Sequence, residues 1–337
     1  MRNRARLMLC AALAGTAGIA ALTVTGGRVQ ADDPNSAPNP YHVVENWAKL
    51  PQGRVWGMAI GVAIDRDGSS VWVYDRCAAK SCEGSNIAPI QKFDASGRLV
   101  VSFGSGLVNW PHGLFVDSDD NIWITDGHGG GGKGHTVMKF AQDGRVLMTL
   151  GKPGVAGNGE DTFNSPSGVL VAPNGDIFVA DGHGDNTNAR IVKFSKDGKF
   201  ITAWGSAGSG PGQFNVPHGL AMDSAGHLFV ADRANNRIQI FDQNGKFLDE
   251  WKQFGRPSGV YIRDDILYVA DSQSSDKVNA PFRQGIRIGS VKDGKVTAFI
   301  AATDPKAEMP EGVTVDKDGH VFGGFTADAD VKEYVKN

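Results

Sequence analysis

The stretch Pro217-His-Gly-Leu-Ala-Met-Asp-Ser-Ala-Gly-His-Leu-Phe-Val-Ala-Asp232 sets the pattern for most of this chain. It is typical of a short apolar strand, a polar turn containing glycine, and a second strand of aromatic and β-branched residues. Five further copies share the pattern, two nearly complete, two recognisable from their first residues and one degenerate: Pro111–Asp126, Pro166–Asp181, Pro257 onward, Pro310 onward and Gly61–Asp75. The sequence therefore contains six repeats of one unit.

The repeat length indicates what each unit forms. Equivalent glycines recur at intervals of 52, 55, 51, 40 and 53 residues: Gly61, Gly113, Gly168, Gly219, Gly259 and Gly312. Third strands are expected at Arg190–Phe194 and Arg237–Phe241, each followed by a glycine turn into a fourth strand. Four short strands per unit of this length are typical of a propeller blade. We predict an all-β, six-bladed β-propeller over residues 55–337.

The segment before the first repeat offers a way to close the ring. Residues 32–40 are expected to be a flexible lead-in, and 32–54 as a whole to join the leader to the propeller. The extended stretch Tyr41–Trp47 is expected to pair with the last blade around Val331–Val335, because an open edge strand invites aggregation.

The first 31 residues have the features of a secretory leader. Arg2, Arg4 and Arg6 supply positive charge, Leu7–Val24 is apolar, and Val29-Gln-Ala31 is a small-residue cleavage site. We predict a signal peptide over 1–31, a periplasmic or secreted protein, and no membrane span in the mature chain. An uncleaved anchor is the alternative, because the apolar stretch approaches the length of a span.

Charge and cysteine content narrow the class of protein further. The formal charge is −3, and removal of a leader with four arginines and no acids gives about −7, which disfavours nucleic acid as a partner. We expect a monomer that acts on a small molecule or a peptide. Cys77 and Cys82 are close together, and in an oxidising compartment they are expected to form a local disulfide. Zinc binding at this pair would need two further soft ligands.

The residue type at one position of the repeat alternates from blade to blade, and the alternation indicates a metal site. The residue after the repeat proline differs from blade to blade: His112, Ser167, His218, Ser258 and Glu311. Equivalent positions in alternate blades of a six-bladed ring lie about 120° apart. His112, His218 and Glu311 are therefore expected to converge in the channel as ligands of a divalent metal, with coordination positions left open. The alternative is a slot that accepts any polar residue at the channel mouth.

The repeats resemble NHL-type six-bladed propellers and, more closely, the propeller of the peptidyl-α-hydroxyglycine α-amidating lyases, over residues 55–325. The pieces that carry the resemblance are Pro111-His-Gly-Leu114, Phe163-Asn-Ser-Pro-Ser-Gly-Val169, Phe178-Val-Ala-Asp-Gly182, Pro211-Gly-Gln-Phe-Asn-Val-Pro-His218 and Val230-Ala-Asp-Arg233. In that family three histidines hold a zinc, so the resemblance implies zinc here, with Glu311 as a departure that admits iron. Gly312 stands where the family has an Asp that helps to hold a calcium, so a structural calcium is not expected.

The resemblance also implies roles for four other residues. Arg76 and Arg233 match family arginines that would grip a substrate carboxylate through paired donors. Met309 matches the family pattern at the substrate pocket, and His183 stands where the family has a tyrosine that serves as base. The alternatives are salt bridges from both arginines to blade aspartates, and an exposed loop around His183.

Gly127-His-Gly-Gly-Gly-Gly-Lys-Gly134 nearly matches a phosphate-binding loop, but it lacks the Ser or Thr after the lysine. A strand is expected at His135–Phe140, where the motif needs a helix. We interpret the segment as a mobile loop over the channel, with His128 and His135 as polar groups.

These observations lead to one main hypothesis and two rivals. By resemblance, the chain is an exported metal-dependent lyase that cleaves an N-acyl-α-hydroxyglycine to an amide and glyoxylate. One rival is a non-catalytic propeller that binds a protein or another ligand, since this fold hosts many functions. The other rival is a metal-dependent hydrolase of the lactonase type.

Overall fold

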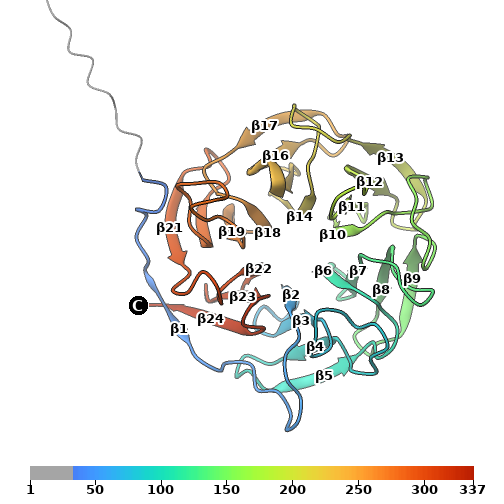
Figure 1. The fold of residues 1–337 in the computed structure, drawn as a ribbon, viewed down its shortest axis with the longest axis horizontal. Helices are drawn as coiled ribbons and strands as arrows, with labels where there is room; N and C mark the ends of the chain where they lie inside the picture. Colours follow the sequence, from blue (N-terminus) through green and yellow to red (C-terminus); the bar gives the residue numbers. More distant parts are fainter. Residues whose placement is uncertain (1–32) are drawn as a thin grey trace, which may run out of the picture. The chain divides into compact units, whose positions relative to one another are not determined.

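Residues 33–337 are described by a computed structural model, in which six four-stranded antiparallel sheets surround a central channel (Figure 1). The six-bladed propeller predicted from the repeats is confirmed. The predicted signal peptide, 1–31, lies outside the described residues. Within the described part, no helix has the length and apolar character needed to cross a membrane.

The blades follow one another along the chain, each built from the channel outward. The first blade holds β2 (Ala59–Ile64), β3 (Val71–Asp75), β4 (Ile90–Phe93) and β5 (Leu99–Phe103). The second holds β6 (Pro111–Val116), β7 (Ile122–Asp126), β8 (Thr136–Phe140) and β9 (Val146–Leu150). The third holds β10 (Pro166–Val171), β11 (Ile177–Asp181), β12 (Arg190–Phe194) and β13 (Phe200–Trp204).

The remaining blades have the same order. The fourth holds β14 (Pro217–Met222), β15 (Leu228–Asp232), β16 (Arg237–Phe241) and β17 (Phe247–Trp251), with the short 3₁₀ helix η1 (Arg233–Asn235) after β15. The fifth holds β18 (Pro257–Arg263), β19 (Ile266–Asp271), β20 (Gly285–Ser290) and β21 (Val296–Ala301). The sixth holds β22 (Pro310–Val315), β23 (Val321–Phe325), β24 (Val331–Lys336) and β1 (Tyr41–Val44).

The ring closes through the N-terminal strand, as predicted. β1 pairs antiparallel with β24, with Tyr41 opposite Lys336 and Val44 opposite Glu333. Hydrogen bonds join the described part of the predicted lead-in, residues 33–40, to the fifth blade. The Asn35 side-chain oxygen accepts from the Arg287 guanidinium at 2.9 Å. The Pro38 carbonyl accepts from the Phe299 amide at 3.0 Å.

The repeat glycines let the innermost strands approach one another closely. A Cβ atom added to Gly113 would lie 2.7 Å from the carbonyl oxygen of Ser167, and one added to Gly259 would lie 2.6 Å from that of Glu311. In both cases the obstructing atom is backbone of the next blade, so no side-chain rotation could relieve the contact. Glycine at this position therefore sets the width of the channel.

A β-bulge next to each repeat glycine directs the preceding residue toward the channel. The pairing of β6 with β7 shifts register between Pro111 and Leu114, and that of β14 with β15 between Pro217 and Leu220. The pairing of β22 with β23 shifts between Pro310 and Gly312. Bulges of this kind bend the strand and re-aim a side chain. The three predicted metal ligands, His112, His218 and Glu311, lie at these bulges.

Cys77 and Cys82 form a disulfide in the loop after β3, as predicted. We expect neither cysteine to react with a thiol reagent in denatured, unreduced protein, and both to react after reduction. Closing so short a loop should stabilise the fold by about 2 kcal/mol, so a Cys77→Ser, Cys82→Ser double variant should unfold at lower denaturant concentration. Mass-spectrometric mapping of the label checks the bond, and labelling without reduction would contradict it.

Candidate metal centre

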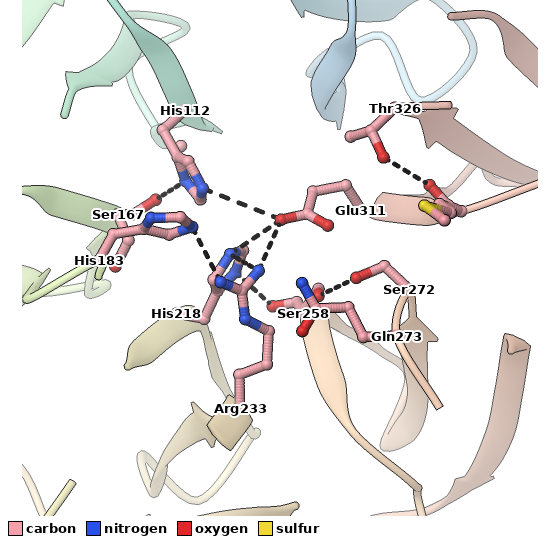
Figure 2. A network of polar contacts seen from close by, with 12 residues as sticks. His112, Ser167, His183, His218, Arg233, Ser258, Ser272, Gln273, Glu311 and Thr326 are labelled. Atoms are coloured by element: carbon pink, nitrogen blue, oxygen red, sulfur yellow. Dashed lines mark hydrogen bonds and ion pairs between the residues drawn. The ribbon is translucent and has the colours of Figure 1, made fainter. Parts of the chain in front are cut away.

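Four side chains meet at one mouth of the channel. His112, His218 and Glu311 project from the innermost strands β6, β14 and β22, and His183 follows β11 (Figure 2). One ligand atom from each of the four lies within 4.8 Å of those of the other three. The predicted convergence of alternate blades is therefore present in the structure. We call these four residues the His/Glu cluster.

The carboxylate of Glu311 lies between two of the imidazoles. Its Oε1 is 2.9 Å from Nε2 of His218 and 3.9 Å from Nε2 of His112. Burial alone would raise the pKa of Glu311, but the neighbouring His218 and Arg233 outweigh it and hold the pKa well below its usual range. The cluster therefore contains one ionised carboxylate at neutral pH.

The two channel histidines both turn Nε2 toward the cluster. Nδ1 of His112 donates to the carbonyl of Ser167 at 2.7 Å, and Nδ1 of His218 donates to that of Ser258 at 3.0 Å. A proton on Nδ1 of a neutral imidazole leaves a lone pair on Nε2. Burial, the largest cause, lowers the pKa of both rings; for His112 this favours the neutral form, whereas for His218 the Glu311 carboxylate opposes the shift. An imidazole held in this way is typical of metal-ligating histidines.

His183 also belongs to the cluster. The sequence analysis did not predict this, because it expected His183 to be a base or part of an exposed loop. Its ring centroid lies 4.5 Å from that of His112 and 5.2 Å from that of His218. The exposed-loop alternative is wrong, because the turn through Gly182 carries the ring inward over the channel. A Cβ atom on Gly182 would overlap the carbonyl of Asn188, so this turn requires glycine. The paired glycines around His183 were the available sequence signal.

Arg233 inserts its guanidinium into the same cluster (Figure 2). One terminal nitrogen, Nη1, lies 3.0 Å from Nε2 of His218 and 3.1 Å from Oε1 of Glu311. The other, Nη2, lies 3.0 Å from Nε2 of His183. The predicted alternative, a salt bridge from Arg233 to a blade aspartate, is wrong, because its acidic partner is Glu311. A cation is thus present where the four candidate ligands converge.

Arg76 is buried without a carboxylate partner among the described residues. Its side chain is 7% exposed, its Nε donates to the carbonyl of Pro111 at 3.1 Å, and its guanidinium lies 3.7 Å from the ring centroid of Trp110. Burial lowers its pKa to about 10, so it remains charged at neutral pH. The alternative of a salt bridge to a blade aspartate is wrong here too. Four buried blade aspartates are paired with other arginines: Arg54, Arg190, Arg237 and Arg287.

Trp110, which the sequence analysis overlooked, links Arg76 to the glycine-rich loop. The His128 ring lies parallel to Trp110 with ring centroids 3.8 Å apart, and the Arg76 guanidinium stacks on the same indole at 3.7 Å. The predicted strand after the loop is confirmed as β8. The interpretation of the loop as mobile is not supported, because Asn109 donates to the His128 carbonyl at 2.7 Å and His135 accepts from the Gly129 amide at 3.1 Å.

Met309 lies directly before β22 and is half-buried. Its carbonyl accepts a hydrogen bond from the Thr326 amide at 3.1 Å. Its predicted contact with substrate stays a prediction.

A cavity of about 490 Å³ runs down the channel from His112, His218 and Glu311 toward the opposite mouth.

This chain is similar to known proteins in its repeats and over most of its length. The NHL repeat model matches residues 163–194 and 214–241. NHL repeat-containing protein 3 of Homo sapiens is 35% identical over 198 residues, which cover 57% of this chain and 54% of that protein. Peptidyl-glycine alpha-amidating monooxygenase A of Xenopus laevis is 34% identical over 300 residues, 82% of this chain and 31% of that protein.

A relative named for the lyase alone is also similar. Peptidyl-alpha-hydroxyglycine alpha-amidating lyase 1 of Drosophila melanogaster is 38% identical over 140 residues, 41% of this chain and 23% of that protein. This chain therefore spans about half or less of the length of these curated relatives. A solved structure of virginiamycin B lyase from Staphylococcus aureus has a TM-score of 0.54 at 18% identity over 87% of this chain and 88% of that one, which supports the fold alone.

The repeats, the sheet topology and the family match define the protein as a six-bladed β-propeller with NHL repeats. Among proteins of this class, it resembles the peptidyl-α-hydroxyglycine α-amidating lyases.

Proposed function

We propose that this protein is an exported, metal-dependent lyase that cleaves an N-acyl-α-hydroxyglycine to an amide and glyoxylate. The observation that carries the proposal is the buried guanidinium of Arg76, which has no carboxylate partner among residues 33–337, beside a cluster of three imidazoles and a carboxylate. A buried cation without a partner is costly unless a ligand supplies the opposite charge. A small substrate with a carboxylate supplies that charge, and the relatives named for the amidating lyase favour this substrate class.

The residues of the cluster fit a divalent metal. Nε2 of His112 is buried and has no hydrogen-bond partner within the described part of the chain, and it points at the other ligands. His112, His218 and Glu311 would hold the metal, zinc by resemblance or iron given the mixed nitrogen and oxygen donors. Such a metal would act as a Lewis acid toward the α-hydroxyl group of the substrate.

The side chains around the cluster have defined tasks in this reaction. Arg76, held by Pro111 and Trp110, would bind the substrate carboxylate, and Arg233 would supply a second cation. The hydroxyl proton passes to a base and on to the amide nitrogen as the C–N bond breaks, and the α carbon becomes the aldehyde carbon of glyoxylate. In the sequence-based hypothesis His183 is that base. In the structure, however, Nη2 of Arg233 lies 3.0 Å from Nε2 of His183, the nitrogen that would accept the proton.

Glyoxylate release from an N-acyl-α-hydroxyglycine tests the proposal. Metal-loaded protein should release glyoxylate above a heat-inactivated control, and chelation should abolish the release. Arg76→Ala should mainly raise KM, by about tenfold or more, since it loses a charge-assisted contact that is present throughout the reaction. Arg98→Ala is the matched control, because Arg98 is exposed and pairs with Asp94 on the surface.

A non-catalytic binding propeller is the second candidate. The similarity to NHL repeat-containing protein 3 and the presence of Arg233 at the centre of the cluster favour it. In that case the protein would bind a ligand or protein partner without turnover, and no glyoxylate would appear with metal fully loaded. For both candidates we propose a monomeric protein that does not bind nucleic acid. We also propose that it is located in the periplasm or the medium, and recovery of a chain that begins near Asp32 would support this export.

A further inference from the structure

His183, which replaces the family's tyrosine, suggests that the metal ligands of this centre differ from those of the lyases. By resemblance, the lyases hold their metal with three imidazoles, one of which is replaced here by Glu311. A third imidazole is nevertheless present, because His183 comes in from the loop after β11. The three rings are inclined to one another by 53° to 69°, so their edges, not their faces, meet at the centre.

Arg233 only partly satisfies these groups. Its two terminal nitrogens contact His218, His183 and Glu311 at 3.0 to 3.1 Å. Nε of Arg233 is buried without a hydrogen-bond partner in residues 33–337, and so is Nε2 of His112. Three nitrogen lone pairs and a carboxylate that converge within 4.8 Å need a compact positive charge, and the planar guanidinium reaches only three of the four.

We propose that His183 is a fourth metal ligand and that Arg233 occupies the metal position only when the metal is absent. The metal would then be held by His112, His183, His218 and Glu311, and the Arg233 guanidinium would turn away from these ligands. His183 would not be a free base, and the substrate proton would go to another group. The inference rests on the proposed use of a metal, but it does not depend on which reaction the centre serves.

The number of ligands has a consequence for the choice of metal. Four protein ligands complete a tetrahedral zinc site and leave no position for a substrate. A six-coordinate metal such as Fe²⁺ or Mn²⁺ would keep two positions open with the same four ligands. We therefore expect a reactive centre here to hold iron or manganese, and zinc to bind as a closed, inactive site.

Metal affinity of the full-length protein tests the ligand set without any assay of activity. Mn²⁺ and Zn²⁺ are titrated separately into chelator-treated protein by calorimetry, and Co²⁺ is added as a spectroscopic probe of coordination. His183→Ala should weaken binding of each metal about a hundredfold, as His112→Ala should, since even lost outer partners cost 10- to 100-fold. His227→Ala is the matched control: this imidazole is 44% exposed, pairs with Asp223 at 2.8 Å in the turn between β14 and β15, and lies outside the cluster, so its loss should change affinity less than threefold.

Arg233→Met separates the two parts of the proposal. It removes the competing cation, so metal affinity should rise several-fold. Wild-type affinity in His183→Ala, confirmed as folded by circular dichroism, would overturn the ligand assignment. Weaker metal binding in Arg233→Met would overturn the role of Arg233 as a placeholder. Tight metal binding through His183 with no glyoxylate release would remove the proposed reaction and leave this inference standing.

Discussion

Glu311→Ala is expected to lose most of its bound metal and to destabilise the metal-free protein by about 3 kcal/mol. The second effect follows because the variant leaves the buried guanidinium of Arg233 without its acidic partner, and breaking one side of a buried ion pair typically costs 3 to 5 kcal/mol. Glu311→Gln should be intermediate, since it keeps a carbonyl oxygen but loses the charge. Glu311→His should retain zinc, because it restores an imidazole at this position.

Metal stoichiometry and chemical denaturation of the metal-free proteins check these expectations. Glu250→Ala is the matched control: it also removes a carboxylate from an arginine, but Arg237 keeps its bond to Asp232, so the loss should stay below about 1 kcal/mol. If Glu311→Ala binds metal as tightly as wild type while His112→Ala and His218→Ala do not, Glu311 is not a ligand.

Gly259→Ala should destabilise the propeller by about 3 kcal/mol and weaken metal binding at the same time. The added Cβ would lie 2.6 Å from the carbonyl oxygen of Glu311 and 3.1 Å from the Cα of Gly312, so the fifth and sixth blades must separate. Overpacking against backbone costs about 1 to 3 kcal/mol and occasionally more. Because the displaced carbonyl belongs to a candidate ligand, the damage should reach the cluster.

Thermal unfolding and metal titration of Gly259→Ala measure the two effects together. Gly159→Ala is the control, because a Cβ there would meet only the side chains of Thr162 and Asp161, at 3.2 and 3.6 Å, in an exposed loop. Its stability should stay within about 0.5 kcal/mol of wild type. Equal melting temperatures for Gly259→Ala and wild type would mean that the blades can part at this seam without cost.

Much of the site could be predicted from position within the repeat. His112, His218 and Glu311 occupy one slot in alternate blades, so the symmetry of the ring alone brings them together. His183 and Trp110 do not occupy this slot. Their places depend on the conformation of single loops, which a repeat pattern does not specify: the turn at Gly182 carries one ring inward, and the stack of Arg76 and His128 holds the other.

The sequence by itself determined the number of blades and the four strands of each, because these follow from the length and pattern of the repeat. It also predicted the closing strand, from the need to cover an open edge, and the disulfide, from the close spacing of two cysteines. Only the tertiary structure decided how Arg76 and Arg233 are used. Both follow the second strand of a blade. Arg76 is stacked on Trp110 and has no carboxylate partner in the described part of the chain, whereas Arg233 lies at the centre of the His/Glu cluster. The difference arises from charges and rings supplied by other blades, which long-range packing places around them and which no local stretch of sequence encodes.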